Sequence, residues 1–114
     1  MIRVKRVYEP HDPEDGHRYL VDRLWPRGVK KGDLLLDGWK DLAPSDDLRR
    51  WVGHDPAKWG EFRRRYEAEL AGNSQSRHFL LDMSRKQDIT LLFSAHDIEH
   101  NNAVVLRSFL EKKR

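Results

Sequence analysis

The stretch Ile89-Thr90-Leu91-Leu92-Phe93 decides the fold class of this chain of 114 residues. It is a continuous apolar run of strand length that begins on β-branched residues. A run without alternation is typical of a strand covered on both faces, as at the centre of a parallel sheet. A helical pattern follows over about 99–112. Together they predict a strand–helix unit that packs back on the sheet as a right-handed crossover.

Two further strands are predicted near the N-terminus. Residues 2–8 alternate apolar and charged side chains over their first half, which is typical of a strand with one solvated face. Residues 19–21 form a short apolar run that leads into Pro26 and Gly28, and these two residues end regular structure. The loop between the strands is short for a parallel crossover, so an antiparallel hairpin stays open as an alternative.

The middle of the chain is predicted to be helical. Ser45 is a favourable N-cap, and Asp55-Pro56 is typical of a second helix start. From Trp59 onward the apolar side chains recur at steps of three and four residues, which marks one face of an α-helix.

A third helix is predicted over 76–87, with Phe79 among its inward side chains. No repeat, low-complexity tract or linker interrupts the chain, so residues 1–114 are expected to form one domain. The predicted fold is α/β, a single small domain with a short, mostly parallel sheet flanked by about four helices.

Composition excludes several kinds of chemistry. The chain has no cysteine, which excludes disulfides, thiolate metal sites and a cysteine nucleophile. No apolar run approaches the roughly 18 residues that span a bilayer, and the N-terminus lacks the apolar segment of a secretory signal. We therefore expect a cytoplasmic protein that does not associate with membranes. The net charge is +3, but basic and acidic excesses alternate along the chain, which favours an ion-paired surface over a dedicated nucleic-acid face.

The expected functional site lies where polar loops follow the strands. In open α/β sheets, ligands bind in the crevice at the carboxyl ends of the strands. Residues 22–28 and 94–97 directly follow two predicted strands. A carboxylate and two guanidiniums in the first loop are suited to holding a small phosphate- or carboxylate-bearing anion. The candidate ligand-binding residues are Asp22, Arg23, Trp25, Arg27, Ser94, Asp97, Asn101 and Asn102.

Each candidate also has an ordinary structural interpretation. Asp22 is able to pair with Arg23 or Arg27 and simply fix the turn. Asp97 is well placed to cap the final helix at its N-terminus. The two asparagines are as compatible with solvent as with the crevice. His54 is a further crevice candidate.

Two catalytic motifs are matched only weakly. His96-x-x-Glu99-His100 fits a zinc hydrolase pattern, but that chemistry needs both histidines on one helical face, and no third histidine or cysteine ligand follows. Ser94 lies near His96, yet no glycine-flanked nucleophile elbow surrounds it. Phosphate-binding, dinucleotide-binding and paired-carboxylate signatures are absent. The sequence therefore predicts no metal and no cofactor, and it names no catalytic residue.

The remaining basic and aromatic residues also have structural interpretations. In the predicted helix, the side chains of Arg63–Arg65 diverge and have glutamates nearby, so a solvated face is favoured over a nucleic-acid contact. Trp39, Trp51 and Trp59 are interpreted as core residues, because large aromatics in a short chain are mostly buried.

Several runs spread over nearly the whole chain are similar to a known family. They are Leu20-Val21-Asp22-Arg23-Leu24-Trp25-Pro26-Arg27-Gly28, Trp39-Lys40-Asp41-Leu42-Ala43-Pro44-Ser45 and Thr90-Leu91-Leu92-Phe93-Ser94-Ala95. With these runs the chain resembles the YeaO-like branch of domain-of-unknown-function family 488. The resemblance implies an α/β fold and a site at the same two strand-end loops, and it brings no established activity.

The chain departs from longer members of that wider family at two places. Those members carry a cysteine after the last strand and a Cys-His-Arg run at the following helix. Here Ser94 and His100-Asn101-Asn102 occupy these neighbourhoods. Thiol chemistry imagined for such relatives, by analogy with rhodanese-like folds, therefore does not carry over.

Three functions stay open at this point. The favoured one is a pocket for a small anionic ligand at the strand ends, and the sequence does not decide whether the ligand is also transformed. The alternatives are a protein-interaction or dimerising domain and a nucleic-acid-binding module, both without catalysis. The sequence does not determine the oligomeric state.

Overall fold

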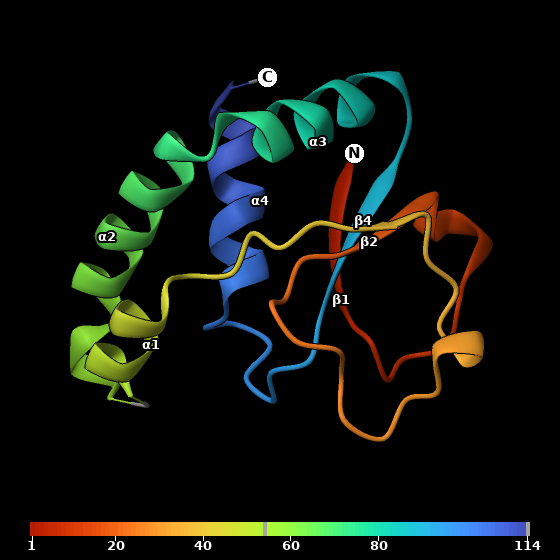
Figure 1. Ribbon diagram of the computed structural model, residues 1–114. Coiled ribbons are helices and arrows are strands. Elements are labelled where there is room, and N and C mark those ends of the chain that lie inside the picture. Colours follow the sequence, from red (N-terminus) through yellow and green to blue (C-terminus); the bar gives the residue numbers. More distant parts are fainter. Residues whose placement is uncertain (54, 114) are drawn as a thin grey trace.

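The computed structural model describes residues 1–53 and 55–113, whose course Figure 1 shows. His54, a crevice candidate, lies outside the described residues. The described residues form a four-stranded sheet in the order β1-β4-β2-β3, and each neighbouring pair is parallel. The strands are β1 (Ile2–Arg6), β2 (His17–Leu20), β3 (Gly38–Trp39) and β4 (Ile89–Phe93).

Helices cover one face of this sheet and loops cover the other. One core cluster joins Ile89, Leu91 and Phe93 of β4 to side chains from all four α-helices of the described chain. A second cluster joins Leu92 on the opposite face to Leu34 and other side chains of the loop between β2 and β3. Figure 1 shows the helices gathered on one side of the strands and this loop on the other. The α-helices are α1 (Asp46–Val52), α2 (Trp59–Gly72), α3 (Ser74–Lys86) and α4 (Asn102–Lys113), with 3-10 turns η1 (Pro13–Asp15), η2 (Lys31–Asp33) and η3 (Pro56–Lys58).

The α/β expectation is confirmed, and β4 lies inside the sheet as its apolar run predicts. All five of its residues are buried. It pairs with β1 along its whole length and with β2 from His17↔Ile89 to Leu20↔Leu92. The hairpin alternative for the first two strands is wrong, because β4 separates them. A run apolar at every position is fully buried only when strands flank it and material covers both faces.

The helix start predicted at Ser45 is confirmed, whereas Asp55 caps the 3-10 turn η3 and α2 begins only at Trp59. The Ser45 side chain accepts a hydrogen bond from the backbone N–H of Leu48 at 3.2 Å, so the predicted N-cap of α1 is confirmed. Phe79 was expected to point inward, and this was wrong, because 38% of it is exposed. Its ring packs edge-on against Tyr19 at 5.6 Å and under the Lys40 ammonium at 4.2 Å. The inward stripe of α3 instead runs through Leu80, Leu81 and Ser84.

The expectation for the arginines of the middle segment is confirmed, and the expectation for Trp39 is not. Each of Arg63–Arg65 pairs with Glu61 or Glu67 along α2, so the ion-paired, solvated face is confirmed. Trp39 was expected in the core, and this was wrong, because it is exposed and its Nε1 donates to the carbonyl of Asp22 at 2.6 Å. Within the described residues, no helix is long and apolar enough to cross a membrane.

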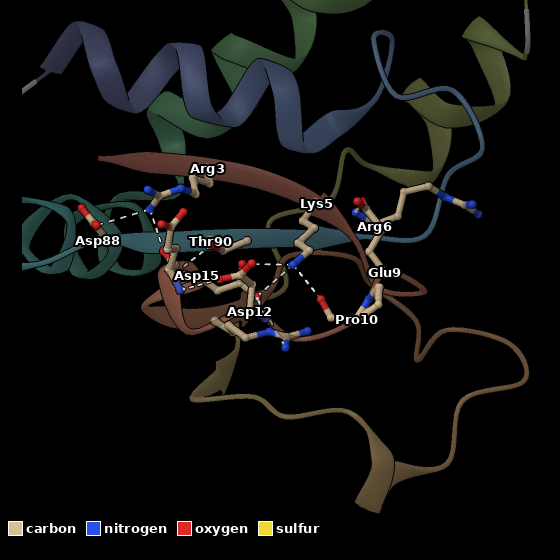
Figure 2. A network of polar contacts seen from close by, with 11 residues as sticks. Arg3, Lys5, Arg6, Glu9, Pro10, Asp12, Asp15, Asp88 and Thr90 are labelled. Carbon is tan, nitrogen blue, oxygen red and sulfur yellow. Dashed lines mark hydrogen bonds and ion pairs between the residues drawn. The ribbon is translucent and has the colours of Figure 1, made fainter.

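A buried carboxylate ties the N-terminal turn to the loop-covered face of the sheet, as Figure 2 shows. Asp15 is only 3% exposed. Its carboxylate accepts hydrogen bonds from Lys5 Nζ at 3.1 and 3.2 Å and from the backbone N–H of Asp12 at 3.1 Å. Arg18 NH1 lies 3.6 Å away, and the hydroxyl of Thr90 donates to the Asp15 carbonyl at 2.7 Å. The turn before β2 is therefore fastened to both β1 and β4.

The neighbouring donors and cations stabilise the negative charge of the Asp15 carboxylate. Burial opposes ionisation, but the backbone N–H of Asp12 and the cations of Lys5 and Arg18 outweigh it and hold the pKa of Asp15 below its usual value. A carboxyl whose pKa is lowered by folding stabilises the folded state above its unfolded pKa of about 3.9. That contribution is lost as the pH falls through the lower folded value.

We predict that Asp15→Asn lowers the free energy of unfolding at pH 7 by about 3 kcal/mol, because it leaves the buried Arg18 and the half-buried Lys5 without a counter-charge. Urea unfolding at pH 7 and at pH 2.5 measures the effect. The gap between native protein and variant should narrow at the lower pH, because protonation of Asp15 removes the charge that distinguishes the two. The exposed Asp82 is the matched control, and Asp82→Asn should change stability by less than about 0.5 kcal/mol. Equal costs for both variants at pH 7 would refute this role of Asp15.

Candidate functional site

A cleft of about 870 Å³ opens at the carboxyl ends of β2 and β4. Its walls come from the loop 22–27 after β2, from the region between α1 and α2, and from the segment that joins β4 to α4. This is the edge of the sheet where the sequence places the site. All eight candidate residues line the cleft: Asp22, Arg23, Trp25, Arg27, Ser94, Asp97, Asn101 and Asn102.

Asp22 joins three segments at the base of this cleft. Its Oδ2 accepts hydrogen bonds from the backbone N–H and the hydroxyl of Ser94, both at 2.9 Å. Its Oδ1 accepts one from the side-chain amide of Asn102 at 3.2 Å. The carboxylate therefore links the ends of β2 and β4 to the first turn of α4. Pairing of Asp22 with Arg23 or Arg27, the structural alternative, is not what the structure has.

The two arginines of the same loop have different surroundings. Arg23 NH1 lies 2.5 Å from the carboxylate of Asp46, at the start of α1. Arg49 pairs with the same carboxylate. The hydrogen bond from Arg49, and after it the charge and hydrogen bond of Arg23, hold the pKa of Asp46 below its usual value. Arg27, in contrast, forms no ion pair with any described residue, and only its carbonyl is engaged, by the hydroxyl of Tyr8 at 2.9 Å.

Trp25 anchors this loop instead of standing free in the cleft. Its Nε1 donates to the carbonyl of Val29 at 2.6 Å, and its ring packs edge-on against Trp39 at 5.7 Å. It also packs against the cluster that contains Leu92. Gly28 has a φ of +79°, a left-handed conformation that favours glycine, so the loop turns back there. Arg27 thus sits at the tip of a loop fixed on both sides.

The segment between β4 and α4 is fixed by polar contacts from two directions. Arg6 donates to the carbonyls of Ser94 at 3.1 Å and Ala95 at 2.8 Å. Asp97 was expected to cap α4, and this was wrong. Its carboxylate accepts from the backbone N–H groups of Glu99 and His100, both at 2.9 Å, in a turn before the helix. Those N–H groups hold the pKa of Asp97 below its usual value.

The residue that caps α4 is Asn101. Its side-chain oxygen accepts from the backbone N–H of Val104 at 3.0 Å, and its amide donates to the carbonyl of Asp97 at 2.9 Å. The helix therefore begins at Asn102 and not near residue 99. Asn101 is 5% exposed, so it shapes the cleft wall and is not solvated. Asparagine and aspartate are similarly favourable N-caps, so residue type alone does not separate Asn101 from Asp97.

The weak catalytic motifs do not assemble into catalytic geometry in this segment. His96, Glu99 and His100 all precede α4, so the two histidines do not lie on one helical face. Across residues 1–53 and 55–113, no group of three or more His, Asp or Glu side chains is arranged to hold a metal ion. The Ser94 hydroxyl donates to Asp22, and its distance of 2.9 Å makes that carboxylate its hydrogen-bond partner.

Sequence reasoning missed a set of cleft residues from the two middle helices. Trp59 stacks on Phe62 with ring centroids 5.2 Å apart, and Phe62 stacks in turn on Tyr66 at 5.9 Å. His100 packs edge-on against Trp59 at 5.0 Å. The helical spacing correctly assigns these rings to one face of α2, but it contains no signal that the first turn of that face reaches the strand ends. The missed lining residues are Arg49, Trp59 and Phe62 of these helices, Asp55 between them, and His100 before α4.

Comparison with known proteins identifies the family. The family described as "Inactive DUF488-N3 subclade" matches residues 1–114. The chain belongs to this subclade. It is 47% identical to the uncharacterized protein YeaO of Escherichia coli over 110 residues, which cover 96% of each chain. It is 40% identical to the uncharacterized protein Rv3073c of Mycobacterium tuberculosis, over 96% of this chain and 92% of that one. No solved structure matches.

The hydrogen bonds of Ser94 give this residue a structural role at the base of the cleft. Ser94 stands near the place where longer members of the wider family carry a cysteine. In this member of the subclade the Ser94 hydroxyl and backbone N–H both donate to Asp22. The position therefore closes the base of the cleft by hydrogen bonding.

We predict that Asp22→Asn lowers the free energy of unfolding by about 2 kcal/mol, because hydrogen bonds to a charged acceptor are lost and an amide donor faces other donors. Urea unfolding measures this cost. Hydrogen exchange at the Ser94 backbone N–H should accelerate by more than the loss of global stability alone would produce. Asp33, an exposed carboxylate on η2, provides the control, and Asp33→Asn should leave both quantities unchanged. Unaltered exchange at Ser94 in Asp22→Asn would contradict the linking role of Asp22.

Proposed function

We propose that the chain binds a small phosphate- or carboxylate-bearing ligand in the strand-end cleft and does not transform it through a covalent step. The observation that carries the proposal is that three arginines line one cleft. Arg23 and Arg27 come from the loop after β2, and Arg49 comes from α1. Guanidinium forks match phosphate and carboxylate oxygens through paired hydrogen bonds.

The acidic side chains of the cleft are already engaged within the fold. Asp22 accepts from Ser94 and Asn102. Asp55 accepts from the backbone N–H of Ala57 at 3.0 Å, and Asp97 accepts from two backbone N–H groups. Each negative charge is thus compensated locally by donors of the fold. The guanidinium without an ion-pair partner among the described residues, that of Arg27, is the group with most to gain from an added anion.

Arg23 and Arg49 supply a second, weaker attraction. Both contact the single carboxylate of Asp46, so two positive charges face one negative charge at the edge of the cleft. The side chains of this group are about half exposed, so solvent screens their mutual attraction and leaves them free to reorient toward a ligand. An anion that reaches Arg27 and Arg49 together would bridge the loop after β2 and α1.

The absence of a covalent step is supported by the chemistry at Ser94. A serine nucleophile needs an adjacent base, most often histidine, that is itself oriented by a third group. The hydroxyl of Ser94 instead donates to a carboxylate that accepts two further hydrogen bonds. The chain also has no cysteine, and its subclade is described as inactive. Binding without transformation agrees with all three.

The test is a thermal-shift and calorimetric titration of the purified protein with inorganic phosphate, sugar phosphates and small dicarboxylates. A ligand present at 100 times its Kd stabilises the folded state by about 2.7 kcal/mol. For a domain of this size that amounts to a rise in Tm of several degrees.

We predict that Arg27→Ala weakens binding of the responding anion by about tenfold or more, since a hydrogen bond to a charged group contributes about 1.5–3 kcal/mol. The fold should be unaffected, because Arg27 makes no side-chain ion pair among the described residues. Arg50→Ala is the matched control, since Arg50 is exposed on α1 and does not line the cleft. Equal affinities of the two variants would remove the cleft as the site. A response only to oligonucleotides, falling steeply with salt, would favour the nucleic-acid alternative.

A further inference from the structure

The aromatic rings of α2 form a column that ends in the strand-end cleft. Trp59, Phe62 and Tyr66 follow one another at helical spacing, and each neighbouring pair is stacked with an interplanar angle of 27°. Tyr66 is fully buried at the core end, and Phe62 is buried beside it. Trp59, at the other end, is half-buried and lines the cleft. The column therefore presents its last ring to the space that a ligand would occupy.

His100 places a second ring at the same point. It lies edge-on to Trp59, with centroids 5.0 Å apart and planes 86° apart. Its Nδ1 is 3.1 Å from the carboxylate of Asp97, which orients the imidazole. Two rings at right angles form a corner that contacts a flat molecule on its face and along its edge.

The size of the cleft exceeds what a simple anion fills. Its volume of about 870 Å³ lies in the range of roughly 300–1,000 Å³ typical of sites for drug-sized ligands. An inorganic phosphate or a short dicarboxylate would contact Arg27 and leave the corner of Trp59 and His100 empty. A ligand that engages both the cations and the rings needs a planar ring and an anionic group in one molecule.

We infer that the ligand of the cleft is a nucleoside-monophosphate-like molecule, with one planar aromatic base joined by a short polar linker to one phosphate. The inference rests on the proposed anion site and names its ligand class. The base lies against Trp59 and His100, and the phosphate lies against Arg27 with Arg23 and Arg49. Stacking of a base on an aromatic side chain contributes to affinity without reading the identity of the base, so purine and pyrimidine monophosphates bind comparably.

The experiment compares four probes by calorimetry with the full chain: inorganic phosphate, ribose 5-phosphate, adenosine and adenosine 5′-monophosphate. We expect the monophosphate to bind at least about tenfold more tightly than each of the other three, because only it engages both ends of the cleft. Trp59→Leu should abolish its advantage over ribose 5-phosphate while leaving the affinity for ribose 5-phosphate unchanged. Trp51→Leu is the matched control, since Trp51 is half-buried against the same helices and does not line the cleft.

A second measurement does not depend on whether Trp59→Leu folds. In a ¹H–¹⁵N spectrum of the native chain, the indole N–H signal of Trp59 should shift on addition of adenosine 5′-monophosphate and stay in place on addition of phosphate. The signal of Trp51 should move with neither. Assignment follows from the signal that disappears in Trp51→Leu and from nuclear Overhauser contacts of Trp59 with Phe62.

The outcomes separate this inference from the proposed function. Equal, Arg27-dependent affinities for phosphate and for the monophosphate would overturn the ring-bearing ligand and leave the anion site standing. Equal affinities for adenosine and the monophosphate would overturn both. Binding of none of the four probes would do the same. Tighter, salt-sensitive binding of a 5′-phosphorylated decanucleotide than of the monophosphate would overturn the assignment to a free nucleotide.

Discussion

The position of β4 between β1 and β2 is the constraint on which the rest of the structure depends. The strand is the last in the chain, yet it supplies the pairing partner for both N-terminal strands. Because all these pairs are parallel, the carboxyl ends of β2 and β4 emerge at one edge of the sheet. The segments that follow them, about 70 residues apart in sequence, are brought together there. A functional site at this edge is thus a consequence of topology before any individual side chain is considered.

Asp22 holds the segments that follow β2 and β4 together by hydrogen bonds. Its carboxylate receives donors from Ser94 and Asn102, so the end of β2 is joined to both the end of β4 and the start of α4. Asn101, next in line, caps the helix and fixes where its first turn begins. With the base of the cleft closed in this way, the arginines around its rim are not needed to neutralise Asp22. Arg23 and Arg49 pair with Asp46 instead, and Arg27 forms no ion pair among the described residues.

The sequence predicts the parts of this arrangement that depend on local chemistry. The β4 run, the N-cap of α1 and the ion-paired Arg63–Arg65 face follow from residue types and spacing alone, and so does the position of the two polar loops at the strand ends. The choice between Asp97 and Asn101 as helix cap does not. Both residues have the chemistry of a cap, and the free energy that decides lies in how α4 packs on the sheet. The residue types and spacing near the helix start do not predict that packing.

Several residues of the cleft are placed there by long-range packing, which the sequence pattern does not predict. Arg49 and Trp59 belong to helices whose residue spacing distinguishes only a core face from a solvated face. That spacing does not indicate which residues lie at a helix end beside a cleft. Trp39 is the converse case. A tryptophan is expected in the core because its large apolar ring gains from burial. Trp39 instead lies at the edge of the sheet, where its indole N–H donates to the Asp22 carbonyl. Large amphipathic rings are ambiguous between these uses, because burial of the ring and hydrogen bonding of its N–H are both favourable.

The environment of Ser94 fits a hydroxyl better than a thiol. A thiolate at this position would lie against the carboxylate of Asp22, and two neighbouring negative charges raise the pKa of the thiol. A hydroxyl stays neutral and donates to that carboxylate at 2.9 Å. A hydroxyl at this position therefore stabilises the junction of the three segments. Beside this junction, Arg23, Arg27 and Arg49 and the corner of Trp59 and His100 line the cleft.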